Sequence, residues 1–170
     1  MQDKLQKLAR GGLLTALALV LSLVDRMFPL QAVVPVPGIK LGLGNVVTLF
    51  ALTALDARQA IAILLCRVVL GAVFAGSVTS LLFSLLGGLT AFAVMWLLLH
   101  KEGSWFSLPG VSIAGAAAHN IGQIGAAVLV LGTVNVVAYL PLLLLSAIPM
   151  GLVTGLVCAA TLTHLKKIRF

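Results

Sequence analysis

The sequence predicts an all-α integral membrane protein in which residues 1–170 form a single bundle of six transmembrane helices. Hydrophobic residues make up 61% of the chain and charged residues only 9%, whereas a soluble domain carries roughly 25% charged residues. The apolar residues also gather in runs, and each helix that crosses a bilayer needs about 20 of them. The chain is long enough for six spans, which we place at about residues 5–28, 41–55, 57–76, 78–99, 111–132 and 137–165.

The first span, at about residues 5–28, follows a short basic segment, and its apolar run ends at Asp25 and Arg26. It lacks the small-residue cleavage site of a secretory signal, so we expect a retained helix. Small residues stand four apart along it, a spacing that lets another helix approach closely. The pattern predicts either packing inside the bundle or docking of a partner subunit, through Gly12, Ala16, Ala18 and Ser22.

The segment Met27–Lys40 contains three prolines, which remove backbone donors and disfavour helix at the preceding residues. The segment is more apolar than is usual for a loop exposed to water. Irregular backbone at membrane depth is tolerated only against protein or a cavity, so the segment is either a lid or a half-buried loop without a gating role. The next run, Leu41–Leu55, is short for a span and carries Asn45. Together with its flanking residues, we expect this run to be just long enough to cross the membrane.

Arg67 lies near the middle of the third span. A charged side chain at the centre of a membrane helix costs at least about 2.5 kcal/mol by insertion scales. We therefore expect Arg67 to face the protein interior or water and to have a partner there. This makes it a candidate binding residue.

The fifth span carries three polar side chains inside a long stretch, residues 103–165, that has no Lys, Arg, Asp or Glu. His119 and Gln123 share one helical face, while Asn120 is turned away from His119 by about 100°. Polar groups in membrane helices commonly pair across helices. The three residues therefore either bridge helices or contact a ligand.

The fourth and sixth spans carry small residues at steps of four, which predicts flat ridges for helix packing. In the sixth span, Pro149 also predicts a kink. The ridge residues are Gly76, Ser80, Ser84 and Gly88 in the fourth span, and Ala147, Gly151, Gly155 and Ala159 in the sixth.

The positions of the basic residues predict the orientation of the bundle. With six spans, both termini lie on one side of the membrane, where Lys and Arg are expected to concentrate if that side is cytoplasmic. Arg26 and Lys40 fall on the opposite side and Arg67 within the membrane. The remaining eight of the 11 basic residues lie on the side of the termini: Lys4, Lys7, Arg10, Arg58, Lys101, Lys166, Lys167 and Arg169. This count predicts a multi-pass protein of the cell membrane with both termini in the cytoplasm. It also explains the net charge of +7 without nucleic-acid binding.

The sequence lacks the residues that several kinds of chemistry require. No G-x-x-x-x-G-K-[ST] motif is present to hold ATP. Only four acidic residues occur, and they are isolated from one another, whereas metal-dependent diphosphate chemistry uses carboxylates to hold the metal. Cys66 and Cys158 stand in apolar runs, where cysteine behaves as a small hydrophobe. We therefore expect no enzyme activity, cofactor or metal site in this chain.

The remaining polar residues indicate that the chain binds a substrate. Several donors lie at membrane depth or at its outer edge without acidic companions, and such a pocket favours an anionic or strongly polar group beside an apolar body. The candidate substrate-binding residues are Arg67, His119, Asn120, Gln123, Asn45 and Lys40.

Three stretches resemble one known family: PGIKLGLGNVVTLFAL at residues 37–52, the helix of Arg67, and GAAAHNIGQ at residues 115–123. They resemble the Gx transporter family, also labelled heptaprenyl diphosphate synthase component I, and through it the S components of energy-coupling-factor transporters. The resemblance implies a six-helix membrane subunit that binds a vitamin or metabolite under a loop between its first two helices. It also implies docking onto a coupling membrane subunit driven by two ATPases. S components usually carry Ala-x-x-x-Ala for docking, where this chain has Gly12 with Ala16 and Ala18 with Ser22.

Three hypotheses follow from these observations. The chain is a substrate-binding S component of an ATP-driven importer for a small, partly apolar metabolite, isoprenoid-like or vitamin-like. Alternatively, it is an auxiliary membrane subunit of a heptaprenyl or polyprenyl diphosphate synthase, although it lacks the D-D-x-x-D motif of such enzymes. The third hypothesis is a purely structural membrane scaffold, which would tolerate loss of Arg67 and His119.

Overall fold

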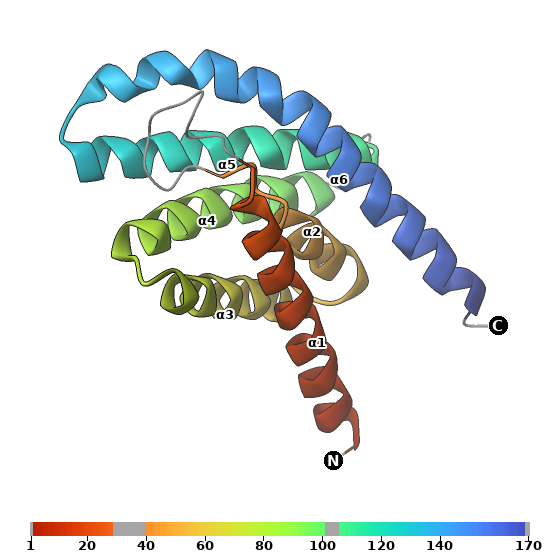
Figure 1. The fold of residues 1–170 in the computed structure, drawn as a ribbon. Coiled ribbons are helices and arrows are strands. Elements are labelled where there is room, and N and C mark those ends of the chain that lie inside the picture. The colour runs from red at the N-terminus through yellow and green to blue at the C-terminus, as the bar shows by residue number, and fades with distance from the viewer. Residues whose placement is uncertain (1, 29–39, 101–105, 169–170) are drawn as a thin grey trace.

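The computed structural model describes residues 2–28, 40–100 and 106–168, and helices are the regular secondary structure of this part of the chain (Figure 1). The predicted loop Met27–Lys40 therefore lies largely outside the described residues. The helices follow one another as α1 (Gln2–Asp25), α2 (Asn45–Ala54), α3 (Ala57–Ala75), α4 (Val78–His100), α5 (Leu108–Leu131), the 3-10 helix η2 (Val134–Tyr139) and α6 (Leu140–Ile168). Five of them, α1, α3, α4, α5 and α6 with η2, are long and apolar enough to cross a membrane. The chain is thus an all-α membrane bundle.

The second predicted span differs from the structure. Helix α2 has 10 residues, about 15 Å at 1.5 Å per residue, which is half of a hydrocarbon core about 30 Å thick. It begins beside the side chain of Arg67, near the middle of the 19-residue α3. Residues 40–44, which precede it, are not helical, and Gly42 has a φ of 85° that L side chains rarely adopt. The run 41–55 is therefore an irregular entry followed by a half-length helix.

The other helices begin and end close to their predicted positions, because local sequence signals define them. Asp56 caps α3 by accepting a hydrogen bond from the Gln59 N–H (2.8 Å). Gly76 and Gly132 end α3 and α5 with φ of 58° and 64°. Helix α5 begins three residues earlier than predicted, since Pro109 is favourable in a first helical turn.

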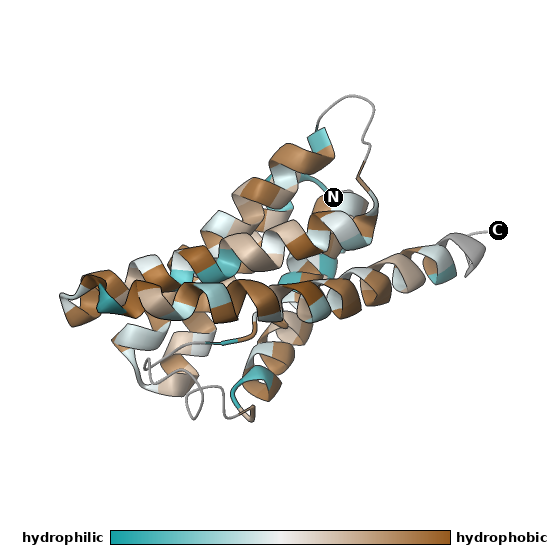
Figure 2. Ribbon diagram, turned by 90° about the horizontal axis from the view of Figure 1, so that it is seen from above, coloured by the Kyte–Doolittle hydropathy of each residue, from teal (hydrophilic) through white to brown (hydrophobic). Residues whose placement is uncertain are grey.

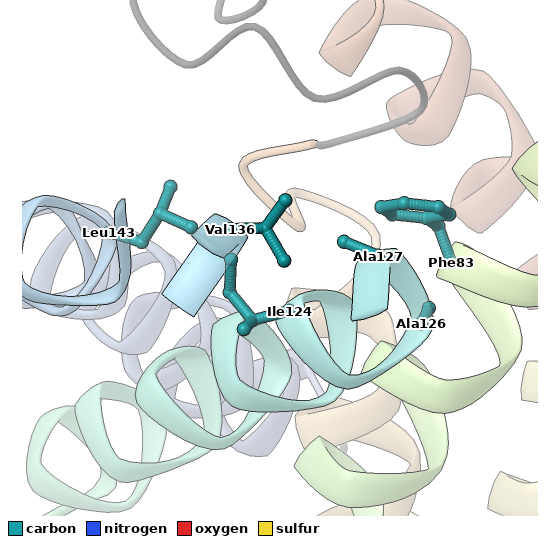
Figure 3. Close-up of a cluster of buried hydrophobic side chains, with 6 residues drawn as sticks. All are labelled: Phe83, Ile124, Ala126, Ala127, Val136 and Leu143. Atoms are coloured by element: carbon teal, nitrogen blue, oxygen red, sulfur yellow. The ribbon is translucent and has the colours of Figure 1, made fainter. Parts of the chain in front are cut away.

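Helix α5 is the centre of the packing and contacts both α4 and α6 along its length. Close approach depends on glycine, because a Cβ at Gly151 or Gly155 of α6 would collide with the backbone of Ile113 or Pro109 in α5. A buried cluster closes one end of this layer (Figure 3). Its members are Phe83, Ile124, Ala126, Ala127, Val136 and Leu143. Helix α6 continues through Pro149 and curves over α5 in Figure 1.

The outer surfaces of the bundle are apolar, as expected where helices face lipid. Leu65, Val69, Val73 and Phe74 of α3 are among the exposed large hydrophobic residues. Figure 2 shows hydrophobic residues along most of the length of the helices.

Helix α1 packs on α2 and α3 but makes no close backbone contact with α6 in the described part of the chain. The terminal parts of α1 and α6 diverge from the bundle in Figure 1. Between them and α2 lies an apolar groove of about 900 Å³, which residues such as Leu17, Phe50 and Leu162 line. We call it the terminal groove.

Candidate functional site

A polar cavity lies where the end of α1, the entry segment 40–44, and helices α3, α4 and α5 meet. Its volume is about 20 Å³, which is room for a water-sized group. We call it the polar cavity. Its charged and polar lining includes Ser22, Asp25, Arg26, Lys40, Arg67 and His119.

Asp25 holds the entry segment in place. Its carboxylate accepts hydrogen bonds from three consecutive backbone N–H groups, those of Leu41 (3.0 Å), Gly42 (2.8 Å) and Leu43 (3.1 Å). Asp25 is only 4% exposed. Backbone donors at membrane depth need such partners, because no water is available to replace them. This role of Asp25 was not predicted from the sequence. The signal that could have found it is an acid at a helix end before a short Gly-rich run.

Arg67 is buried and incompletely paired. Its side chain is 6% exposed, and its Nη2 donates to Asn45 Oδ1 over a long 3.4 Å. Its Nε has no hydrogen-bond partner among the residues that the structure describes. Gly44 contacts the guanidinium so closely that a Cβ at this position would overlap it. The sequence-based expectation of a partner for Arg67 is therefore met only in part, by Asn45.

Lys40 and Arg26 meet at one serine. The Lys40 ammonium donates to Ser80 Oγ (2.9 Å) and Ser84 Oγ (2.7 Å). Arg26 Nη2 donates to the Gly71 carbonyl (2.8 Å) and to the same Ser80 Oγ (3.2 Å). Burial, together with the neighbouring charge of Arg26, lowers the pKa of Lys40 to about 8. Ser80 and Ser84 were predicted as part of a packing ridge, and Arg26 was not predicted as a site residue. The role of these residues in the site depends on contacts between segments that are distant in sequence.

His119 and Gln123 are the residues that α5 contributes to the candidate site. With its amide oriented to satisfy both ends, Gln123 accepts from His119 Nε2 (3.0 Å) and from the Lys40 N–H (3.2 Å), and donates to the Lys40 carbonyl (3.0 Å). The His119 ring packs against Gly42 and Gly87, where a Cβ would approach it to within about 2.9 Å. These contacts fix the backbone of Lys40 against α5.

Asn120 lies apart from this group. Its Nδ2 donates to the Leu143 carbonyl of α6 (2.6 Å), and its side chain is 4% exposed. The offset of about 100° between neighbouring helical residues accounts for the separation. The structure thus brings Arg67, His119, Gln123, Asn45 and Lys40 together, and places Asn120 between helices.

The residues predicted to dock a partner also separate into two kinds. Gly12 and Ala16 are exposed on α1. Ala18 is 1% exposed and packs inside the bundle, while Ser22 donates to its carbonyl (2.8 Å) and lines the polar cavity. Docking through Gly12 and Ala16 stays a prediction.

Comparison with known proteins adds one match. The family model for "Heptaprenyl diphosphate synthase component I" matches residues 14–161, which is most of the chain and includes every residue of the polar cavity described above. The chain belongs to the heptaprenyl diphosphate synthase component I family. No curated protein and no solved structure matches it. The word "component" in the family name implies a partner subunit.

In this member of the heptaprenyl diphosphate synthase component I family, the polar cavity carries an excess of positive charge. Arg26, Lys40 and Arg67 line it with one acid, Asp25. Asp25 is already occupied by backbone N–H groups. Of the three cations, Arg67 is buried, and burying an incompletely paired charge is costly. The cavity therefore suits an incoming group that carries negative charge or strong acceptors.

Proposed function

We propose that this chain is the substrate-binding membrane subunit of an ATP-driven importer of the energy-coupling-factor type. Its substrate is a small, partly apolar metabolite whose polar end enters the polar cavity. The observation that carries this proposal is the buried Arg67, which lines a cavity formed by residues of several elements and whose Nε has no partner in the described part of the chain. Such intramembrane cations are by default candidates for substrate sites.

The way in which the chain enters α2 supports the same function. Membrane transporters build substrate sites from discontinuous helices, in which irregular backbone lines a cavity at membrane depth. Here residues 40–44 are irregular, Gly42 lines the polar cavity, and α2 starts beside Arg67. The entry segment therefore belongs to the substrate site.

Energy for uptake would come from partner subunits. The sequence has no Walker-type phosphate loop, and the acid of the polar cavity is engaged with the backbone. We propose that the chain binds its substrate without transforming it. We also propose that it lies in the cell membrane with both termini cytoplasmic, which places the polar cavity toward the outer side.

The test is to purify the tagged chain from its native membrane and identify what accompanies it. We expect an ATPase and a coupling membrane subunit, and a small molecule in the extract that is lost from Arg67→Gln. Uptake of that molecule should stop on ATP depletion. Recovery of neither subunit, together with uptake that is insensitive to ATP, would contradict the proposal.

The family name favours a second candidate, an auxiliary membrane subunit of a heptaprenyl or polyprenyl diphosphate synthase. In that case the catalytic aspartates belong to a soluble partner. The chain would be added to such a synthase in liposomes while the rate and product length are measured. A change in either quantity, abolished by Arg67→Gln, supports this candidate, and no change argues against it.

A further inference from the structure

Among the described residues, the hydrogen bonds that the side chains of Lys40 and Arg26 donate in the polar cavity go to neutral oxygens rather than to an acidic side chain. Lys40 and Arg26 both donate to Ser80 Oγ, at 2.9 and 3.2 Å. A serine hydroxyl has two acceptor lone pairs, so these two cations occupy both. Their other acceptors, Ser84 Oγ and the Gly71 carbonyl, are also neutral. Neutral oxygens are weaker partners for a cation than an anion is.

Asp25 does not correct this imbalance. Its two carboxylate oxygens accept from Leu41, Gly42 and Leu43, so they serve the entry segment first. Arg26, Lys40 and Arg67 provide three positive charges against this single negative one, which leaves an excess of two. Arg67 adds an independent sign of an absent partner, because its buried Nε makes no hydrogen bond within residues 2–28, 40–100 and 106–168.

We propose that the head group bound here is an oxyanion with two negative charges, of the phosphate monoester or diphosphate class. It lies between Arg26 and Lys40 on one side and Arg67 on the other. This inference rests on the proposed function, since it names the chemistry of the substrate for the same cavity. Arginine favours such groups because its planar fork makes paired hydrogen bonds with their oxygens.

The small size of the polar cavity indicates how the head group is accommodated. About 20 Å³ admits only a water-sized group. The Lys40 ammonium stands at the end of a flexible four-carbon stem, and its present acceptors are two serines. A phosphate oxygen is a stronger acceptor than a serine hydroxyl, so the ammonium leaves Ser80 and Ser84 for the ligand. Arg26, which is exposed, can follow it without breaking the core.

The experiment uses three probes with the same eight-carbon tail: octyl phosphate, octanoate and octanol. Their affinities for the purified full chain in detergent would be measured by calorimetry at pH 7.5. We expect affinity to fall in that order. Losing one hydrogen bond to a charged group costs about tenfold or more in affinity.

Two variants locate the binding site. Arg26→Gln and Lys40→Met should each weaken octyl phosphate about tenfold, and should leave octanol unchanged. Arg58→Gln is the matched control, since Arg58 is an exposed arginine outside the polar cavity and its loss should change nothing. Arg26→Lys should restore part of the affinity, because it keeps the charge but not the fork.

The other possible outcomes would overturn either the charge proposed for the head group or the anion site itself. Equal affinities for octanoate and octyl phosphate, both weakened by Arg26→Gln, would overturn the dianion while leaving a binding subunit for anions. Affinity for octanol as high as for octyl phosphate, no effect of either variant, or no binding of any probe would overturn the anion site. Failure of the proposed importer would look different: octyl phosphate would bind, but no ATPase would accompany the chain.

Discussion

Asp25 shows how one side chain can fix irregular backbone inside a membrane protein. Three consecutive N–H groups point at its carboxylate, and the segment that they belong to leads directly into α2. Hydrogen bonds to a charged acceptor are stronger than those between neutral groups. The position of the entry segment therefore depends on the charge of this residue as well as on its size.

Replacing Asp25 by Asn should destabilise the protein by about 2 kcal/mol, because hydrogen bonds to a charged group are each worth about 1.5–3 kcal/mol. The amide keeps one acceptor oxygen, but its NH₂ group faces backbone donors. Thermal unfolding in detergent would measure the effect. Asp56→Asn is the control, since Asp56 is exposed and accepts from a single N–H. Equal losses for the two variants would contradict the anchoring role of Asp25.

Lys40 should make the binding of octyl phosphate depend on pH. Burial lowers its pKa to about 8, so raising the pH from 7 to 9 removes the ammonium proton and weakens octyl phosphate. The phosphate itself stays dianionic in this range, because its second pKa is about 6. Calorimetry on Lys40→Met should give a flat profile, and a slope as steep as that of the wild type would refute the assignment. The groups that face Lys40 are Asp25 at the end of α1 and Arg26 directly after it, Arg67 of α3, Ser80 and Ser84 of α4, and His119 and Gln123 of α5.

The stability of the empty protein should change in the opposite direction. The folded-state pKa of Lys40 is about 8, below its ordinary value of 10.5. The unfolded chain therefore binds more protons than the folded chain between these values, and the free energy of unfolding rises with pH across this window. Thermal unfolding of the ligand-free protein at pH 8 and pH 10 would show the rise, and Lys40→Met should reduce it.

At the scale of the elements, runs of apolar residues predicted most of the helices. The structure shows that local signals set their ends, because caps such as Asp56 and Ser107, and glycines such as Gly76 and Gly132, act within one turn of the chain. Helix α2 could not be predicted in this way, because an apolar run has the same composition whether it is helical or irregular. Its true start depends on Asp25 and Arg67, which are distant in sequence.

The residues of the candidate site also differ in whether the sequence alone could identify them. Arg67, His119 and Gln123 were found because polar groups in an apolar span are conspicuous. Arg26, Ser80 and Ser84 gain their role only when Lys40 folds back onto α4, and periodicity does not report such a contact. Asn120 was grouped with its neighbours by sequence, but its place on the helix turns it toward α6.

Packing of α5 on α6 should be sensitive to one added methyl group. Gly151→Ala places a Cβ against the backbone of Ile113, which cannot move aside as a flexible side chain can. Overpacking of this kind costs about 1–3 kcal/mol. Gly125→Ala on α5 is the matched control, because nothing lies within 4 Å of the added atom. Thermal unfolding should separate the two variants, and similar melting temperatures would argue against tight packing at Gly151.

For the whole molecule, the distribution of basic residues predicts the orientation in the membrane. In a variant without Cys66 and Cys158, single cysteines would replace Met27 or Arg58, which are both exposed. An impermeant maleimide should label the cysteine at position 27 in intact cells. It should label the one at position 58 only after permeabilisation. The reverse pattern would invert the bundle and place the polar cavity toward the cytoplasm.

Helix α2 touches two different parts of the bundle. At its first residue, Asn45 bonds Arg67 beside the polar cavity, and farther along, Phe50 and Ala54 line the terminal groove. The two hollows therefore border opposite ends of the same ten-residue helix.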